Sequence, residues 1–315
     1  MLDVRKMELL AELARLGTIA AVAQARFRTP SAVSQQLSAL EREAGVPLLR
    51  RNGRGVELTP AGVELAGRTG PVLDLLEQAA GALAASRADL SGELRIGVFP
   101  TAVRTLLPAA LVALAAEHPR LELRVTELDP AQVPDALRAR TLDLALVHEY
   151  DYVPAEPDPA LVTEPILEET VFLAAAPSLA AAPFAGRTAA GEPADPVRAS
   201  RTAPWIAASP GTLCHLMAVR WCEAAGFAPR IRHYADDFAA VLTLVAAGQG
   251  VALVPELALA DCPDGVRLTP LAARRRTLTA SRAAAVAHPA VAAGAAAIRQ
   301  AAAAYPRSLR YGARD

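Results

Sequence analysis

Compact hydrogen-bonding side chains recur at helical spacing in one short segment of the chain: Ser31, Ser34, Gln35 and Ser38. Hydroxyl and amide groups of this size bond to base edges and phosphate oxygens without the length or charge of an ordinary solvated helix face. The segment therefore predicts a helix whose polar face enters the major groove of duplex DNA. An ordinary amphipathic helix with a polar surface is the alternative.

The opposite face of this segment is apolar, because Val33, Leu37 and Leu40 also follow helical spacing and must pack on neighbouring helices. Thr29 predicts the N-cap, and Pro30 suits the first helical position, where no N–H is required. Unpaired amides and the helix dipole at this end favour an anion. Thr29 and Pro30 are therefore expected beside a DNA phosphate.

The flanking residues predict the rest of a winged DNA-binding head. Val4 to Leu16 forms a buried first helix that ends at Gly17, and Thr18 caps a short second helix over residues 19–25. Farther along, residues 50–56 contain an Asn-Gly turn with three arginines, which is typical of a β-hairpin. Its arginines suit the phosphate backbone or the minor groove, and the candidates are Arg51 and Arg54.

This head resembles that of the LysR-type transcriptional regulators in the order and spacing of many residues. The resemblance is carried by Ser31-Ala32-Val33-Ser34-Gln35-Gln36-Leu37, Leu40-Glu41, Gly45-Val46-Pro47-Leu48-Leu49-Arg50-Arg51 and Leu58-Thr59-Pro60-Ala61-Gly62. It implies a multidomain chain: an all-α winged helix-turn-helix head with a small β wing, a linker helix, and a bilobal α/β effector domain of periplasmic-binding-protein type. It also implies a transcription regulator that binds double-stranded DNA as a homodimer or homotetramer.

The expected domains are the head over 1–60, a linker or dimerisation helix over 61–90 and the effector domain over 91–315. Lobe I takes about 91–160 and 267–315, and lobe II about 161–266. In the linker, apolar residues recur at alternating four- and three-residue steps, as in a coiled coil: Val72, Leu76, Ala79 and Leu83. Gly70-Pro71 falls inside this helix and predicts a kink or break. Two shorter helices in a monomer remain the alternative.

From Ser91 onward, alternating strand and helix patterns predict a mainly parallel sheet covered on both faces. The expected strands of lobe I are 94–99, 121–128 and 142–147, with one helix over 100–117. The expected strands and helices of the remaining chain are 170–175, 205–207, a helix over 212–225, 230–234, a helix over 238–247, 251–254, 267–271 and 277–286.

The resemblance places a ligand between the two lobes, where helix N-termini present unpaired amides to an anionic group. The strand-to-helix turns here are Phe99-Pro100-Thr101 and Ser209-Pro210-Gly211-Thr212. Thr101, Ser209 and Thr212 are candidates for holding a carboxylate, and each could instead serve only as a helix cap. Acidic groups near Tyr234 and Asp236, and the segment around His148, could line the same cleft and suit an ammonium. The expected effector is a small carboxylate or amino acid. The full set of candidates is Phe99, Pro100, Thr101, His148, Ser209, Gly211, Thr212, Tyr234 and Asp236.

Composition and motifs limit the other functions. The net charge is −1 over 315 residues, but residues 1–60 hold nine basic and six acidic side chains. No signal sequence or membrane-length apolar run opens the chain, which predicts a cytoplasmic protein. Cys214, Cys222 and Cys262 fit no zinc spacing and predict reduced thiols. No P-loop, nucleophile elbow or metal motif is present, so we expect no enzyme, no cofactor and no metal. The rival hypothesis is a bilobal receptor or enzyme whose head serves only for assembly.

Overall fold

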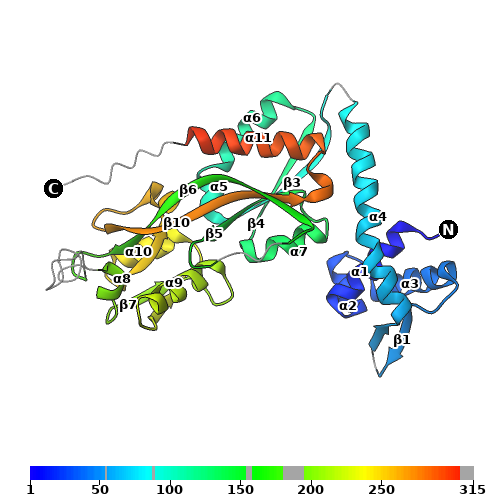
Figure 1. The fold of residues 1–315 in the computed structure, drawn as a ribbon, viewed down its shortest axis with the longest axis horizontal. Helices are drawn as coiled ribbons and strands as arrows, with labels where there is room; N and C mark the ends of the chain where they lie inside the picture. Colours follow the sequence, from blue (N-terminus) through cyan, green and yellow to red (C-terminus); the bar gives the residue numbers. More distant parts are fainter. Residues whose placement is uncertain (54, 87–88, 154–157, 180–194, 306–315) are drawn as a thin grey trace. The chain divides into compact units, whose positions relative to one another are not determined.

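The computed structural model describes residues 1–53, 55–86, 89–153, 158–179 and 195–305 (Figure 1). The chain forms two units, 1–86 and 87–315. The first contains α1 (Val4–Leu16), α2 (Ile19–Ala25), α3 (Pro30–Ala44), the hairpin strands β1 (Leu49–Asn52) and β2 (Gly55–Leu58), and α4 (Pro60–Ala85). The predicted bounds of α1 and α2 are confirmed.

The core of the head is built from one apolar face of each short helix. Leu10 and Leu13 of α1, Val22 of α2 and Leu37 of α3 are buried together with Leu48 before the wing. Side chains at the N-caps Asp3, Thr18, Thr29 and Thr59 each accept a hydrogen bond from a backbone N–H of the helix that follows. The helix starts expected at Thr18 and Thr29 are confirmed by these caps.

Of the kink or break expected at Pro71, the break is wrong, because α4 runs as one helix from Pro60 to Ala85 with Pro71 inside it. Proline leaves the carbonyl of Gly67, four residues earlier, without its helical partner. Gly67 and Pro71 are both exposed, so water can bond to that carbonyl. The first turns of α4 pack on the head through Leu65 and Ala66.

The second unit, the predicted effector domain, contains a six-stranded sheet in the order β4-β3-β5-β10-β6-β9 and a two-stranded parallel pair, β7-β8. Its strands are β3 (Gly92–Val98), β4 (Leu121–Glu127), β5 (Leu144–Tyr150), β6 (Leu161–Ala175), β7 (Pro204–Ala207), β8 (Arg230–Tyr234), β9 (Ala252–Pro255) and β10 (Arg267–Arg282). Its helices are α5 (Pro100–Arg104), α6 (Leu107–Glu117), η1 (Pro130–Gln132), α7 (Val133–Arg138), α8 (Pro196–Ala199), α9 (Leu213–Ala224), α10 (Phe238–Ala246), η2 (Glu256–Asp261), η3 (Ala283–Ala285) and α11 (Pro289–Ala304).

The expectation of a mainly parallel sheet is wrong, since the large sheet is mixed. β3 pairs in parallel with β4 and β5, whereas β10 is antiparallel to both β5 and β6. β10 is a single strand rather than the two predicted, and β6 begins well before Thr170. One hydrophobic cluster gathers around β3 and β5, and two others around β7 and β9; we call these parts lobe I and lobe II. The two long strands belong to both parts, since β10 pairs with β5 and with β6, and β6 also pairs with β9.

The helix predicted over 100–117 is also divided, into α5 and α6. Pro108 occupies the first turn of α6, where its missing N–H requires no partner, but it cannot continue a helix from α5. Alanine-rich α11 was not among the predicted elements. It packs on lobe I, where Gly294 lies so close to Leu94 and Leu144 that a Cβ would approach them at 2.8 and 3.0 Å.

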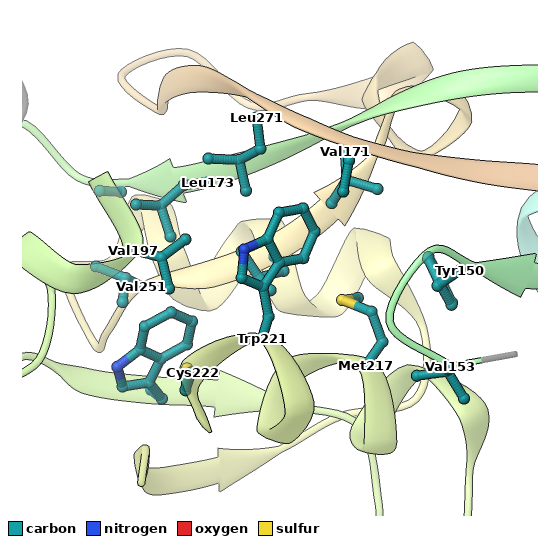
Figure 2. Packing of buried hydrophobic residues seen from close by; sticks show 14 residues of the cluster. Tyr150, Val153, Val171, Leu173, Val197, Met217, Trp221, Cys222, Val251 and Leu271 are labelled. Carbon is teal, nitrogen blue, oxygen red and sulfur yellow. The ribbon is translucent and has the colours of Figure 1, made fainter. Parts of the chain in front are cut away.

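Different contacts stabilise the two lobes: a hydrophobic cluster in lobe II and a partly buried carboxylate with two arginines in lobe I. In lobe II, Trp205 and Trp221 anchor a cluster in which Met217 and Cys222 pack under Val171 and Leu173 of β6 (Figure 2).

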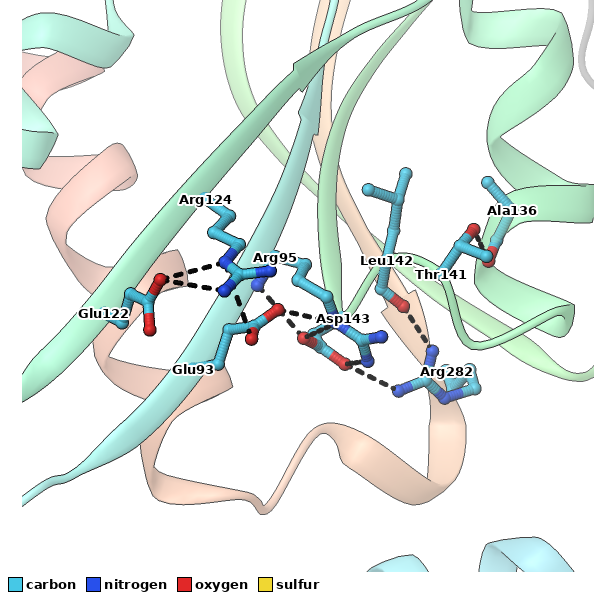
Figure 3. Close-up of polar contacts among 9 residues, drawn as sticks. All are labelled: Glu93, Arg95, Glu122, Arg124, Ala136, Thr141, Leu142, Asp143 and Arg282. Carbon is cyan, nitrogen blue, oxygen red and sulfur yellow. Dashed lines mark hydrogen bonds and ion pairs between the residues drawn. The ribbon is translucent and has the colours of Figure 1, made fainter. Parts of the chain in front are cut away.

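In lobe I, Asp143 receives hydrogen bonds from Arg95 Nη2 at 2.7 Å and Arg282 Nη2 at 3.3 Å, and so fixes the middle of β3 and the start of β5 to the end of β10 (Figure 3). Burial works to raise the pKa of Asp143, but Arg95 and Arg282 lower it below its usual value.

Candidate DNA-binding and effector sites

The predicted polar face of α3 is a surface of the head. Ser31, Ser34, Gln35 and Ser38 are exposed, whereas Val33, Leu37 and Leu40 on the opposite face are buried. Thr29 Oγ1 accepts the Ala32 N–H at 3.3 Å and lies 3.1 Å from the Ser31 hydroxyl. The first turn of α3 thus carries hydroxyl groups and free amides at its exposed end, which suits a phosphate.

On β1 the wing carries two cations, Arg50 and Arg51, which differ in their partners. Arg50 and Asn52 both bond to Glu57, which stands opposite Arg50 in the hairpin register. Arg51 is exposed and forms no ion pair with the residues described. Arg54, the other predicted wing contact, lies outside the described residues.

Glu41 connects α3 to the wing. Its Oε1 accepts the backbone N–H groups of Leu48 and Leu49, each at 3.0 Å. Thr59 continues the connection, since its hydroxyl donates to the Pro47 carbonyl at 2.8 Å. A fixed relation between helix and hairpin lets both contact one duplex at the same time. The resemblance included Glu41, but its role as a brace was not predicted.

Several cations of the head are already paired within it. Arg26 Nε donates to Glu12 at 2.8 Å, and this hydrogen bond raises the pKa of Arg26. Lys6 pairs with Glu43. Arg5 and Arg28 are exposed, and they line a charged depression together with Gln36 of α3, in which basic side chains outnumber the acidic Asp3 and Glu8. Positive charge therefore lies close to the polar face of α3.

In the effector domain, the predicted residues Phe99 and Thr101 face a buried ion pair that was not predicted. Arg275 is fully buried, and its Nε donates to Glu169 at 2.6 Å. Both Nη atoms of Arg275 lie 3.5 Å from the Thr101 hydroxyl, and its guanidinium carbon lies 5.2 Å from the centroid of the Phe99 ring. Pro100 begins α5, a helix too short to supply much of a dipole.

His148 lies beside this pair and connects it to lobe II. Its ring is 4.8 Å from Phe99, and its Nε2 is 3.7 Å from Cys214 Sγ on α9. Burial holds the pKa of His148 well below its usual range, so the ring is neutral at pH 7. Its Nδ1 has no hydrogen-bond partner, and neither does the hydroxyl of Thr277, its cross-strand neighbour. Both buried atoms can bond to a water or a ligand group.

The Cys214 thiol is a poor nucleophile in this place. Burial raises the pKa of Cys214 to about 11, and the Tyr150 hydroxyl lies 3.5 Å from its sulfur. Cys222 is buried with its pKa raised to about 12, again by burial. All three cysteines are free, as expected. Because reactivity follows the thiolate fraction, these thiols are suited to packing.

The predicted residues of lobe II gather at the start of α9. The Ser209 N–H and hydroxyl donate to Asp236 at 2.7 and 2.9 Å, and Thr212 Oγ1 accepts the His215 N–H at 3.1 Å. Gly211 adopts φ of 94°, a left-handed conformation that favours glycine. Tyr234 is half exposed and stacks on His215. Ser209 and Asp236 therefore brace each other, and Thr212 caps α9.

A cavity of about 370 Å³ opens beside His148, between lobe I and the start of α9. Its walls are mainly apolar, with Val147 and Leu278 from the sheet and Leu213 from α9, and Glu149 and Asp158 also line it. This size and lining are typical of small-molecule sites. Among the predicted effector residues, His148 is the one that lines the cavity.

Comparison with known proteins supplies the identity. Residues 87–303 match the LysR substrate binding domain, and residues 4–63 match the bacterial regulatory helix-turn-helix protein, lysR family. The chain belongs to the LysR-type transcriptional regulators. The regulator is 30% identical over 266 residues to the transcriptional activator IlvY of Salmonella typhimurium, covering 84% of this chain and 86% of that protein. Such relatives are transcriptional regulators and activators rather than enzymes.

Solved structures agree with the fold of this LysR-type regulator. Full-length OxyR from Pseudomonas aeruginosa matches with a TM-score of 0.63 at 19% identity, over 95% of each chain. LysG from Corynebacterium glutamicum, solved with bound effector Arg, matches with a TM-score of 0.56 at 20% identity, over 96% of this chain and 98% of that one. As in its family, this regulator binds DNA and small-molecule effectors.

Arg275 is the site residue that sequence reasoning missed most clearly. It lies in the run Arg274-Arg275-Arg276, which resembles a solvated charge cluster. Only the alternation of a strand distinguishes the three, because Arg275 points into the core while its neighbours face outward to carboxylates such as Asp151. The available signal was the apolar pair Leu271 and Ala273, which lies in phase with Arg275 in an alternation of buried residues that continues to Thr279. Within the described residues, no helix is long and apolar enough to cross a membrane.

Proposed function

We propose that this regulator reads a specific duplex sequence with the exposed face of α3, as a homodimer or homotetramer, and responds to a small carboxylate-bearing effector. The observation that carries the DNA-reading part is the uncharged Ser and Gln face of α3, which Glu41 braces to a wing bearing Arg51. Ser31, Ser34, Gln35 and Ser38 contact base edges and nearby phosphates, Thr29 and Pro30 present amides to a phosphate, and Arg51 with Arg54 contacts the backbone.

Pairing of subunits is supported by α4, whose outer face carries large exposed apolar side chains. Leu75, Leu76 and Leu83 are 66%, 51% and 70% exposed. Such a stripe on a long helix is the surface that a second copy of the same helix covers. Two heads joined in this way address two half-sites of one operator.

The test of the DNA face separates base reading from general attraction. Duplexes selected by the full-length protein from a random-sequence library serve as targets, and unselected duplexes as the reference. Ser34→Ala and Gln35→Ala should lower discrimination between the two pools, whereas Arg51→Ala should weaken binding to both. Gln78→Ala, an exposed glutamine on α4, is the matched control. Equal losses on both pools for all three variants would contradict the assignment.

The effector site is proposed at the cavity beside His148 and the start of α9. The unpartnered Nδ1 of His148 and the α9 amides favour a polar or anionic group. The charge of Asp236 adds to burial in raising the pKa of Asp129, so two carboxyl groups lie near each other there and suit an ammonium. An amino acid carries both groups, and LysG was solved with such an effector, arginine.

This part is tested with the full-length protein and a panel of the common amino acids and simple carboxylic acids. A thermal-shift screen should find a compound that stabilises the protein. Thr163→Val, which changes an exposed threonine in the cavity wall, should then weaken its binding while DNA affinity stays unchanged. Thr243→Val, an exposed threonine on α10, should change neither. An unchanged dissociation constant in Thr163→Val would place the effector outside this cavity.

A further inference from the structure

The turn between α2 and α3 has a backbone conformation that suits glycine, and Phe27 occupies it. The Phe27 N–H donates to the Gln24 carbonyl at 3.2 Å, and the Arg28 N–H donates to the Ala23 carbonyl at 2.8 Å. These two bonds close a Schellman motif, whose left-handed residue is usually Gly and sometimes Asn. Phe27 takes that position with φ of 51°.

The Phe27 side chain does not stabilise the described fold by packing. It is 99% exposed and packs on none of the hydrophobic clusters of the described residues. A large aromatic residue is disfavoured in left-handed backbone, because its Cβ crowds the neighbouring carbonyl groups. Residues held in such conformations concentrate at functional sites. The ring therefore points to a partner outside the chain.

The position of this turn, directly before α3, indicates that the partner is duplex DNA. Phe27 lies just before the Thr29 cap and Pro30 that begin α3, and the start of a recognition helix is the part that enters the groove. The next residue, Arg28, is exposed and lines the charged depression shared with Arg5 and Gln36. Exposed guanidinium groups beside an exposed ring suit a duplex, which offers phosphates and apolar groups side by side.

We propose that Phe27 is a further DNA-contact residue, whose ring packs on the apolar groups at the wall of the major groove where α3 enters. Those groups are the C5-methyl of thymine and the carbons of deoxyribose. The proposal rests on the DNA-binding face of α3 described above. Because the ring carries no charge, its contact adds affinity without the release of counterions.

The test uses Phe27→Gly and Phe27→Asn in the full-length protein, with duplexes selected by the wild-type protein. Both residues accept left-handed backbone, so hydrogen exchange should show severalfold greater protection of the α2 amides. Affinity for the selected duplex should nevertheless fall by about tenfold, within the range that the loss of one base-pair contact costs. The slope of affinity against salt should not change, whereas Arg28→Ala should reduce that slope by about one.

Arg140→Gly is the matched control, because Arg140 is the other described non-glycine residue with positive φ, at 55°, and it lies in the effector domain. It should leave DNA affinity unchanged. Replacing individual thymines by deoxyuridine distinguishes the two contacts. A methyl contact makes the wild type lose affinity and Phe27→Gly insensitive, whereas a sugar contact leaves both insensitive.

Two results would overturn the proposal: wild-type affinity in both Phe27 variants, or loss of affinity together with loss of amide protection, which marks a structural role. The Ser34→Ala and Gln35→Ala measurements keep this failure separate from failure of the α3 face. If those variants lose discrimination while the Phe27 variants bind normally, α3 reads DNA and Phe27 does not contact it.

Discussion

The guanidinium of Arg275 lies over the ring of Phe99 in the interior of the effector domain, with 5.2 Å between its central carbon and the ring centroid. β10 supplies the arginine, and the turn after β3 supplies the ring. Glu169 of β6 neutralises the charge at 2.6 Å. Three segments of the effector domain are therefore held together by one buried cation, which lies two residues along β10 from Thr277, the cross-strand neighbour of His148.

Arg275→Ala should destabilise the effector domain by about 3–5 kcal/mol, because it leaves the buried carboxylate of Glu169 without its counter-ion. Urea unfolding followed by tryptophan fluorescence measures the loss, since Trp205 and Trp221 both lie in this domain. The double variant R275M/E169Q should lose less than Arg275→Ala, since it buries no unpaired charge. A double variant that is less stable than the single one contradicts this account.

The loss in Arg275→Ala should also depend on pH. Burial raises the pKa of Glu169, and Arg275 opposes that rise in the wild type. Without Arg275 the folded-state pKa of Glu169 rises further above its unfolded value, so the native state binds a proton that the unfolded state releases. Stability of the variant should then be greatest at acid pH and fall as pH rises through the raised pKa. Urea unfolding at pH 5 and pH 8 checks the sign, and a larger loss at pH 5 contradicts it.

Local signals predicted the elements of the chain better than their long-range connections. Thr18, Thr29 and Pro30 mark helix starts by their own chemistry, so the head could be outlined from sequence. The continuity of α4 through Pro71 is explained by the exposure of Gly67, whose carbonyl can bond to water in place of the missing N–H. The rule that proline breaks a helix does not take that exposure into account. The full length of β10 and the burial of Arg275 depend on strands far away in the sequence. Arg275 and Tyr150, opposite each other in register, were therefore not recognised as parts of one site.

Removal of the Glu41 carboxylate should loosen the wing. Charged hydrogen bonds contribute about 1.5–3 kcal/mol each, and Glu41 accepts two, from Leu48 and Leu49. Glu41→Ala should therefore speed hydrogen exchange at both amides and weaken binding to selected and unselected duplexes alike. Glu41→Gln keeps an uncharged acceptor and should fall between Glu41→Ala and the wild type. Wild-type exchange at Leu48 and Leu49 in Glu41→Ala would show that the carboxylate does not brace the wing.

Alkylation of Cys214 should be slow at neutral pH and accelerate in alkali. Its pKa of about 11 compares with 9.0 for an ordinary thiol, so the thiolate fraction at pH 8 is about a hundredfold smaller. Iodoacetamide labelling, resolved by peptide mass spectrometry, should give a rate that rises about tenfold per pH unit up to pH 10. The urea-unfolded protein is the control and should react far faster. Rapid labelling of the folded protein at pH 7 contradicts burial of this thiol.

Gly62→Ala should displace the first turn of α4 from the wing. A Cβ at Gly62 would lie 2.2 Å from the Leu48 carbonyl oxygen, and backbone on both sides leaves little room to move. Overpacking of this kind costs about 1–3 kcal/mol. Gly67→Ala is the matched control on the same helix, where a Cβ meets nothing within 4 Å, and it should stabilise α4 by about 0.5–1 kcal/mol.

Hydrogen exchange of the α4 amides separates the two glycine variants, with protection lowered in Gly62→Ala and raised in Gly67→Ala. The same order should appear in DNA binding, because Leu48 also donates its N–H to Glu41 and so connects α4, wing and recognition helix. Gly62→Ala should bind selected duplex more weakly, while Gly67→Ala binds as the wild type does. Equal protection in the two variants would mean that the backbone of Leu48 moves aside, and that the wing is not positioned by its contact with α4.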